Sequence, residues 1–196
     1  MKYYPVLLDL KNRKCCVIGG GKVAERKVKA LLKADSLVFV ISPILTKSLK
    51  RLARAKEIVH EKTVYKRSLI KGSFLVIAAT DERAVNEKVS RDAQDLGILA
   101  NIVDVPSLSN FIVPSVIERN GLIISISTSG KAPCLSKKIR LDLTEKLIPR
   151  YARMLKPLEE VRCSLKSARL DGKKRKAVLN KFINSGLSEK GINLKI

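Results

Sequence analysis

The chain has 196 residues, 45% of them hydrophobic, which is enough for one globular domain with a real core and an appended part. Its formal net charge of +22 favours an anionic partner, while four scattered cysteines and one histidine exclude a disulfide scaffold and argue against a metal site, so we assign no metal ligands. We expect a cytoplasmic protein without a membrane span, because the early apolar run ends at Asp9 and the run Phe74–Ala79 is far shorter than the roughly 20 residues of a helical span.

Apolar segments of strand length alternate with helical patterns through the first hundred residues. This alternation predicts an α/β fold with a Rossmann-like doubly wound parallel sheet, in which the adjacent Cys15 and Cys16 point to opposite faces of the first strand. Asp81-Glu82 should cap a helix that Gly97 ends, and His60 should have a structural or surface role. The expected strands are Cys15–Ile18, Leu37–Ile41, Glu57–His60, Phe74–Ala79 and Ile98–Asn101, and the expected helices are Lys22–Lys33, Thr46–Ala55, Tyr65–Lys71 and Asp81 to about Leu96.

The pattern changes after Asp104. Phe111–Ile117 and Leu122–Ser127 both have strand character, and Asn120-Gly121 between them is a strong signal for a tight turn. We therefore expect an antiparallel hairpin outside the parallel sheet. Because a two-stranded hairpin is marginally stable by itself, we expect it to pack on other parts, with a second copy of the chain as a cover.

The sequence from Ala132 to about Leu187 is helical in composition, and we expect Pro149 and Pro157 to divide it into several short helices. The basic run Lys173–Lys176 lies on one of these predicted helices. We divide the chain into a Rossmann-like domain (residues 1–110), a hairpin region that we expect to mediate dimerisation (111–145) and a basic helical domain (146–196). Apolar residues recur at Leu135, Ile139, Leu143 and Leu147, and the apolar side of the basic helix consists of Val178, Leu179 and Phe182.

Three consecutive glycines, Gly19-Gly20-Gly21, follow the first predicted strand and lead directly into a helix. With Ala24 they have the spacing G-x-G-x-x-A, which holds a pyrophosphate on bare backbone N–H groups at a helix N-terminus. Gly19 allows the tight turn, Gly21 lacks the side chain that would block the phosphates, and Ala24 lets the helix pack close to its strand. Because strand and helix flank the glycines, the pattern predicts a dinucleotide site more specifically than a glycine cluster alone.

Several short motifs, in the order found in the family, resemble those of the dehydrogenase module of siroheme synthase, which also exists as a free-standing precorrin-2 dehydrogenase. They extend over residues 1 to about 140, and we expect the unfused form because no methyltransferase domain follows. The motifs are Tyr4-Pro5-Val6, Gly19–Lys27, Ala78–Asp81, Asn101–Asp104, Phe111–Ser115 and Ser127–Pro133.

The resemblance implies NAD-dependent oxidation of precorrin-2, a tetrapyrrole fringed with carboxylates, to sirohydrochlorin. It also implies a homodimer built through the hairpin region and, in some members, insertion of ferrous iron. The matching aspartate of the family is implicated in both reactions, so the resemblance gives Asp104 the role of catalytic base. Taken alone, the residues leave open that Asp104 only caps a loop before Pro106.

The cofactor residues are expected at the ends of three strands. A typical NAD site has an acidic residue about 20 positions beyond the glycines, whereas this chain has Ser42 there. Nearby cations leave NADP open, and NAD is preferred on the family resemblance. We expect Gly21, Lys22 and Val23 at the pyrophosphate, Ser42, Pro43 and Ile44 at the adenosine ribose and Thr80 beside the dinucleotide; the nearby cations are Lys47, Lys50 and Arg51.

The polar segment after the hairpin, with Ser127, Thr128, Ser129 and Lys131, is expected to bind substrate carboxylates, and a plain linker is an equal alternative. Ser129 stands where the family often has a glycine. Two other functions stay open. One is a non-catalytic NAD-binding regulatory domain, and the other is a nucleic-acid-binding protein, which only the charge supports because the chain has few aromatic residues for base stacking.

Overall fold

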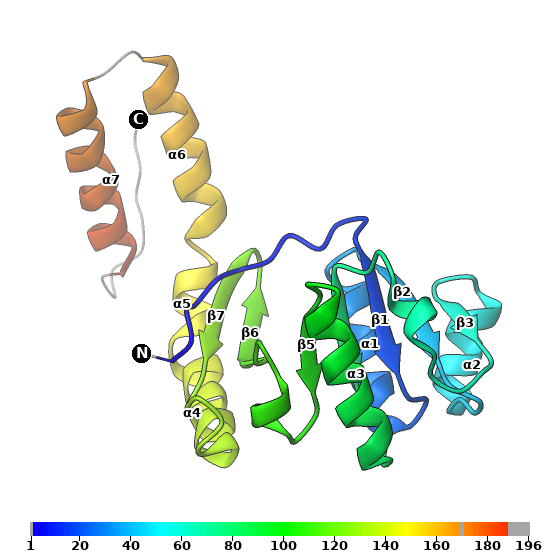
Figure 1. Cartoon of the computed structure of the whole chain (residues 1–196). Coiled ribbons are helices and arrows are strands. Elements are labelled where there is room, and N and C mark those ends of the chain that lie inside the picture. Colours follow the sequence, from blue (N-terminus) through cyan, green and yellow to red (C-terminus); the bar gives the residue numbers. More distant parts are fainter. Residues whose placement is uncertain (1, 169–170, 188–196) are drawn as a thin grey trace. The chain divides into compact units, whose positions relative to one another are not determined.

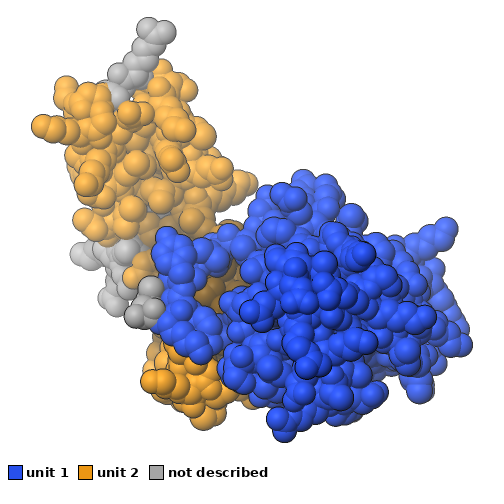
Figure 2. All heavy atoms as spheres, in the orientation of Figure 1, with its two compact units in different colours: residues 1–113 blue, residues 114–196 orange. Residues whose placement is uncertain are grey.

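The computed structural model describes residues 2–168 and 171–187, apart from the side chains of Arg150 and Leu187. Contacts between residues divide the chain into two compact units, residues 1–113 and residues 114–196 (Figures 1 and 2). In the described residues, unit 1 combines a parallel sheet with helices, and unit 2 combines a β-hairpin with further helices.

Unit 1 is built on the strands β1 (Lys14–Ile18), β2 (Leu37–Ile41), β3 (Val59–Glu61), β4 (Leu75–Ala78) and β5 (Leu99–Ile102). They form a five-stranded sheet in the order β3-β2-β1-β4-β5, and all neighbouring strands are parallel. Cys15 and Cys16 of the central strand are both fully buried, in two different core clusters, because both faces of the sheet are covered. The predicted doubly wound parallel sheet is confirmed.

The helices of unit 1 are α1 (Lys22–Leu32), α2 (Lys47–Arg54) and α3 (Arg83–Asp95), with 3-10 helices η1 (Arg67–Ile70) and η2 (Pro106–Leu108). Val28 of α1 and Leu49 of α2 belong to one core cluster, and Val89 of α3 belongs to the other, so the helices lie on both faces of the sheet (Figure 1). The predicted bounds in this unit agree to within two residues, but the helix expected at Tyr65–Lys71 is a short 3-10 helix.

The helix ends show which side chains fix them. Thr46 caps α2, because its Oγ1 accepts a hydrogen bond from the N–H of Leu49 at 3.2 Å. Capping by Asp81-Glu82 is wrong for α3: Glu82 stands at the N-cap position but its side chain makes no capping bond. Thr80 Oγ1 instead accepts from the N–H of Glu82 at 3.3 Å. Gly97 ends the helix as expected, with a left-handed φ of 66°.

The free edge of β5 is paired by the side chains of Ser109 and Asn110. Asn110 Oδ1 accepts from the N–H of Ala100 at 2.7 Å, and its Nδ2 donates to the carbonyl of Ile98 at 3.2 Å. Ser109 Oγ accepts from the N–H of Ile102 at 2.9 Å. The segment after Asp104 therefore pairs with the backbone N–H and C=O groups at the free edge of β5, as a sixth strand would. These bonds also fix the turn at the end of β5.

The loop between β1 and α1 brings two other loops against it. Gly19 has a φ of 116°, and a Cβ there would lie 2.3 Å from the carbonyl oxygen of Ala79. A Cβ on Gly20 would lie 1.9 Å from the carbonyl oxygen of Ile44, while the Gly20 carbonyl accepts from the N–H of Thr46 at 3.0 Å. The chain after β2 and the chain after β4 thus both approach the glycine loop more closely than any side chain would allow.

Unit 2 begins with the hairpin β6 (Ser115–Arg119) and β7 (Leu122–Ile126), which pair antiparallel. The turn residues Asn120 and Gly121 have positive φ values of 52° and 83°, as the Asn-Gly signal predicts. β6 starts four residues later than Phe111–Ile117 predicts. Ile117 is buried, and Ile124 packs with it against Ile148, so one face of the hairpin is covered by the helical part of its own unit.

The helices of unit 2 are α4 (Pro133–Lys146), α5 (Ile148–Ala152), α6 (Leu155–Ser167) and α7 (Gly172–Leu187). Pro149 and Pro157 lie in the first turns of α5 and α6, where a missing N–H costs no helical hydrogen bond. Among the apolar residues that recur every four positions along α4, Leu143 packs against the hairpin, whereas Leu135 and Leu147 are exposed. No helix within the described residues has the length and apolarity that crossing a membrane requires.

Replacing Gly20 with alanine is expected to destabilise unit 1 by about 1–3 kcal/mol, because the added Cβ meets a backbone carbonyl rather than a flexible side chain. Gly21→Ala is the matched control, since a Cβ at Gly21 meets nothing within 4 Å and its φ of −82° suits any residue. Urea unfolding of both variants and the wild type measures the difference. Equal stability of the two variants would contradict the assigned role of Gly20.

Candidate functional site

An open pocket of about 670 Å³ lies where β1, β2 and β4 end, and four segments form its wall. These are the β1–α1 loop, the β2–α2 loop, residues 63–65 after β3 and the β4–α3 loop. The carboxyl ends of parallel strands are where ligands of doubly wound sheets bind. Eight of the nine predicted cofactor residues line the pocket: Gly19, Gly21, Lys22, Val23, Ser42, Pro43, Ile44 and Thr80.

Ala24 is the ninth, and the structure places it beneath the pocket rather than in its wall. It is fully buried in the core cluster between α1 and the sheet, which matches the packing role expected of the third small residue. The N-cap residue Gly21 has no side chain to accept from the first turn, so the free N–H groups of Lys22 and Val23 lie at the pocket wall. Such a helix end attracts an anion.

The end of β2 carries no carboxylate. Ser42 is buried, and its hydroxyl donates a hydrogen bond to the carbonyl of Ile44 at 2.8 Å, which leaves only its lone pairs for a ligand. His60 Nε2 lies 2.9 Å from the Ser42 carbonyl, so the histidine braces this loop, as its predicted structural role requires. Ile44 is 76% exposed and offers an apolar surface at the pocket wall.

The end of β4 is held by a pair of hydrogen bonds between Thr80 and Asn86. Thr80 Oγ1 donates to Asn86 Oδ1 at 2.9 Å, and Asn86 Nδ2 donates to the Thr80 carbonyl at 2.9 Å. Asn86 is buried in α3, and the sequence interpretation missed it because its partner lies in a loop whose conformation the pattern does not specify. It also missed the wall formed by Val64 and Tyr65, since no strand order had been predicted that would bring β3 beside β2.

The glycine motif continues into Glu25, which links α1 to α2. Its carboxylate accepts from Thr46 Oγ1 at 2.7 Å and forms an ion pair with Lys29. Hydrogen bonds from Lys29 and Thr46 lower the pKa of Glu25 to about 2. The charged form is therefore the one that holds the two helices in register beside the pocket.

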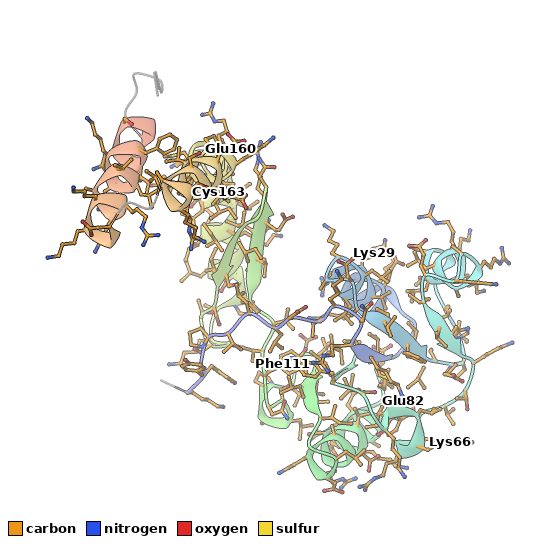
Figure 3. The ribbon with its side chains drawn as sticks, turned by 90° about the horizontal axis from the view of Figure 1, so that it is seen from above. Lys29, Lys66, Glu82, Phe111, Glu160 and Cys163 are labelled. Atoms are coloured by element: carbon orange, nitrogen blue, oxygen red, sulfur yellow. The ribbon has the colours of Figure 1, made fainter. Side chains whose placement is uncertain are left out.

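Asp104 does not line this pocket. It follows β5 directly, is exposed, and has a left-handed φ of 62°, which aspartate tolerates better than most residues. Asn101 and the Ser109–Asn110 pair hold the backbone on either side of this turn, with Asn101 Nδ2 donating to the carbonyl of Phe111 at 3.1 Å. Phe111 itself packs against the core cluster that contains α1 (Figure 3). The strained turn thus presents a free carboxylate at the carboxyl edge of the sheet.

The polar segment Ser127–Lys131 belongs to unit 2 and leads into α4. Ser127 Oγ accepts from the N–H of Ser129 at 3.0 Å, and Thr128 Oγ1 accepts from the N–H of Ala132 at 3.0 Å. Ser129 has a φ of 56°, which is the left-handed conformation that a glycine would adopt without strain. Both hydroxyls therefore stabilise the turn, while Lys131 is exposed.

No group of three or more His, Cys, Asp or Glu side chains in the described ranges is arranged to hold a metal ion. Cys134 and Cys163 are exposed, and neither lines the pocket.

Comparison with known proteins identifies relatives of most of the chain. Siroheme synthase of Photobacterium profundum is 42% identical over 151 residues, 77% of this chain and 32% of that protein. Siroheme synthase of Methylobacillus flagellatus is 40% identical over 177 residues, 90% of this chain and 38% of that protein. A solved structure titled "SirC, precorrin-2 dehydrogenase" has a TM-score of 0.82 at 26% identity and covers 95% of this chain and 94% of that one.

These findings confirm the resemblance that the motifs indicate, although the chain spans only about a third of the length of the siroheme synthases. The family model NAD_binding_7, described as "Putative NAD(P)-binding", matches residues 6–115. That range contains the whole parallel sheet, the glycine loop and Asp104. Because the match covers more than half of its residues, the chain belongs to the NAD_binding_7 family of NAD(P)-binding domains.

Proposed function

We propose that this protein is an NAD-dependent dehydrogenase that oxidises precorrin-2 to sirohydrochlorin. The observation that carries the proposal is the structural match to a protein titled precorrin-2 dehydrogenase over 95% of the chain. The open pocket at the N-terminus of α1 supports it independently, because it offers the bare N–H groups that a dinucleotide needs. Fold alone would not distinguish among the many reactions of Rossmann-like domains.

In this proposal the chain mainly positions its reactants. The N–H groups of Lys22 and Val23 bind the diphosphate, and the Ser42–Ile44 loop contacts the adenosine ribose. A bound nicotinamide would supply the hydride acceptor for this oxidation, in which the macrocycle also loses one proton. Asp104 accepts that proton, because its carboxylate is free of hydrogen bonds and ion pairs within the described residues.

The cofactor is a nicotinamide dinucleotide, and we propose NAD on the resemblance to siroheme synthases. The absence of an acidic residue at the end of β2 removes the usual contact to the ribose hydroxyls. The hydroxyl of Ser42 donates its proton to the carbonyl of Ile44, so its oxygen can still accept a hydrogen bond from one ribose hydroxyl. Ser127, Thr128, Ser129 and Lys131 stay proposed substrate contacts, with the exposed Lys131 as the cationic one.

The outward face of the hairpin supports a homodimer. Val116 and Ile123 are 44% and 47% exposed, and both lie on the face opposite to the buried Ile117 and the half-buried Ile124. A second copy of the chain that pairs through this face would bury apolar surface that unit 2 itself leaves in water.

The direct test is an anaerobic assay of the purified protein with precorrin-2. We expect absorbance changes of sirohydrochlorin formation with NAD and none without it. Subsequent addition of ferrous iron tests for chelation, which the proposal treats as a second reaction at Asp104. A protein that binds NADH but leaves precorrin-2 unchanged would instead favour the alternative, a non-catalytic NAD-binding regulatory domain.

Gly21→Asp is expected to abolish NADH binding, weakening it at least about 100-fold, because the new carboxylate occupies the open space at the helix N-terminus and repels the phosphates. Fluorescence titration with NADH measures the loss. Gly172→Asp is the matched control: it adds the same charge at a glycine with equally open surroundings in unit 2. Unchanged NADH affinity in Gly21→Asp would contradict the loop assignment.

Asp104→Ala is expected to lower kcat for precorrin-2 oxidation at least about 100-fold, in the range typical of a lost general base, while NADH affinity changes less than about twofold. Steady-state kinetics and the same titration separate these effects. Asp95→Ala, which removes an exposed carboxylate that pairs with Arg67, is the control. Wild-type turnover by Asp104→Ala would remove this residue from the mechanism.

Light scattering during gel filtration is expected to give a mass of about twice the 21.7 kDa of the chain. Ile123→Asp should shift the protein to monomer, because it places a charge in the proposed interface. Leu37→Asp, at an equally exposed apolar residue of unit 1, should stay dimeric. A wild-type monomer, or a dimer unaffected by Ile123→Asp, would refute this interface.

A further inference from the structure

Lys27 is a charged residue that the proposed function has not used. It lies on α1, one position before the fully buried Val28 and three after the fully buried Ala24, and its side chain is half-buried. Among residues 2–168 and 171–187, its ammonium group makes no hydrogen bond and no ion pair. A lysine withdrawn from water without a partner costs free energy, so such a position calls for an explanation.

The residues on either side of Lys27 in α1 and the residue before Asp104 contribute to the same core cluster. Val103, which immediately precedes Asp104, packs against the same core cluster as Ala24 and Val28, which flank Lys27 on α1. Phe111 packs there too, at the other end of the segment that closes the edge of β5 (Figure 3). Helix α1 and the turn at Asp104 therefore share one core cluster, and both lie within unit 1.

The pKa of Lys27 depends on the charge of Asp104. Burial lowers the pKa of Lys27, the charge of Arg26 lowers it further, and the charge of Asp104 raises it. The two side chains thus interact through space, yet no ion pair joins them. A half-buried cation without a partner can bind a further anionic group through a charge-assisted hydrogen bond.

We propose, building on the proposed function, that Lys27 binds a carboxylate of the tetrapyrrole substrate and so sets its position relative to Asp104. The interaction supplies the partner that the folded chain does not give to this ammonium group. The cofactor site is not involved, because Lys27 does not line the pocket at the glycine loop. Lys27 is therefore a substrate-binding residue whose loss raises KM rather than abolishing the chemical step.

The test uses uroporphyrin, a polycarboxylate tetrapyrrole that cannot be oxidised in this reaction, as a fluorescent probe of binding. Lys27→Met is expected to weaken uroporphyrin binding about 10- to 100-fold, the range for a lost charge-assisted hydrogen bond, and to raise KM for precorrin-2 similarly. Lys27→Arg should restore most of the affinity. Lys33→Met removes the same charge from an exposed position at the end of α1 and should change affinity less than about twofold.

Two further measurements separate this role from a structural one. Lys27→Met should keep NADH affinity within about twofold and should melt no lower than the wild type, because it removes an unpaired, half-buried charge. A structural lysine would lower the melting temperature instead.

Wild-type uroporphyrin affinity and KM in an active Lys27→Met variant would overturn the inference and leave the proposed function intact. Failure of the wild-type protein to bind uroporphyrin would overturn the inference as well. Absence of precorrin-2 turnover in a wild-type protein that binds NADH would count against the proposed function itself.

Discussion

The close approach of three loops at the carboxyl end of the sheet is the constraint on which the rest of unit 1 depends. Gly20 lets the β2–α2 loop come within contact of the β1–α1 loop, and the bond from Thr46 to the Gly20 carbonyl holds it there. Thr46 then caps α2 and donates to Glu25 of α1. One backbone contact, possible only without a Cβ, therefore sets two helices and leaves the first N–H groups of α1 facing an open pocket.

Much of the fold could be predicted because its signals are local. Apolar strands, the G-x-G-x-x-A spacing and the Asn120-Gly121 turn each act over a few residues, and the structure contains all three. The role of Gly20 could not be predicted, because it depends on a loop more than 20 residues away in the sequence. The same holds for Ser109 and Asn110, whose side chains complete the edge of β5, since that edge exists only once the strand order is known.

Two carboxylates of the predicted motifs, Glu25 and Asp104, differ in whether the folded chain gives them hydrogen-bond and ion-pair partners. Glu25 is held by Thr46 and Lys29, and its pKa falls to about 2, so its charge serves the packing of helices. Asp104 stands in a left-handed turn without a hydrogen bond or ion pair in the described part of the chain, so its charge is available for chemistry. Sequence spacing treats both as polar residues near a strand end, and only their partners distinguish structure from function.

The proposed function requires a dinucleotide to bind with its diphosphate on the N–H groups at the start of α1. A crystal structure of this protein soaked with NAD tests this requirement directly. The account predicts diphosphate density against Gly21, Lys22 and Val23, with the adenosine beside the Ser42–Ile44 loop. An empty pocket at saturating NAD, or a nucleotide bound elsewhere on the chain, would contradict it.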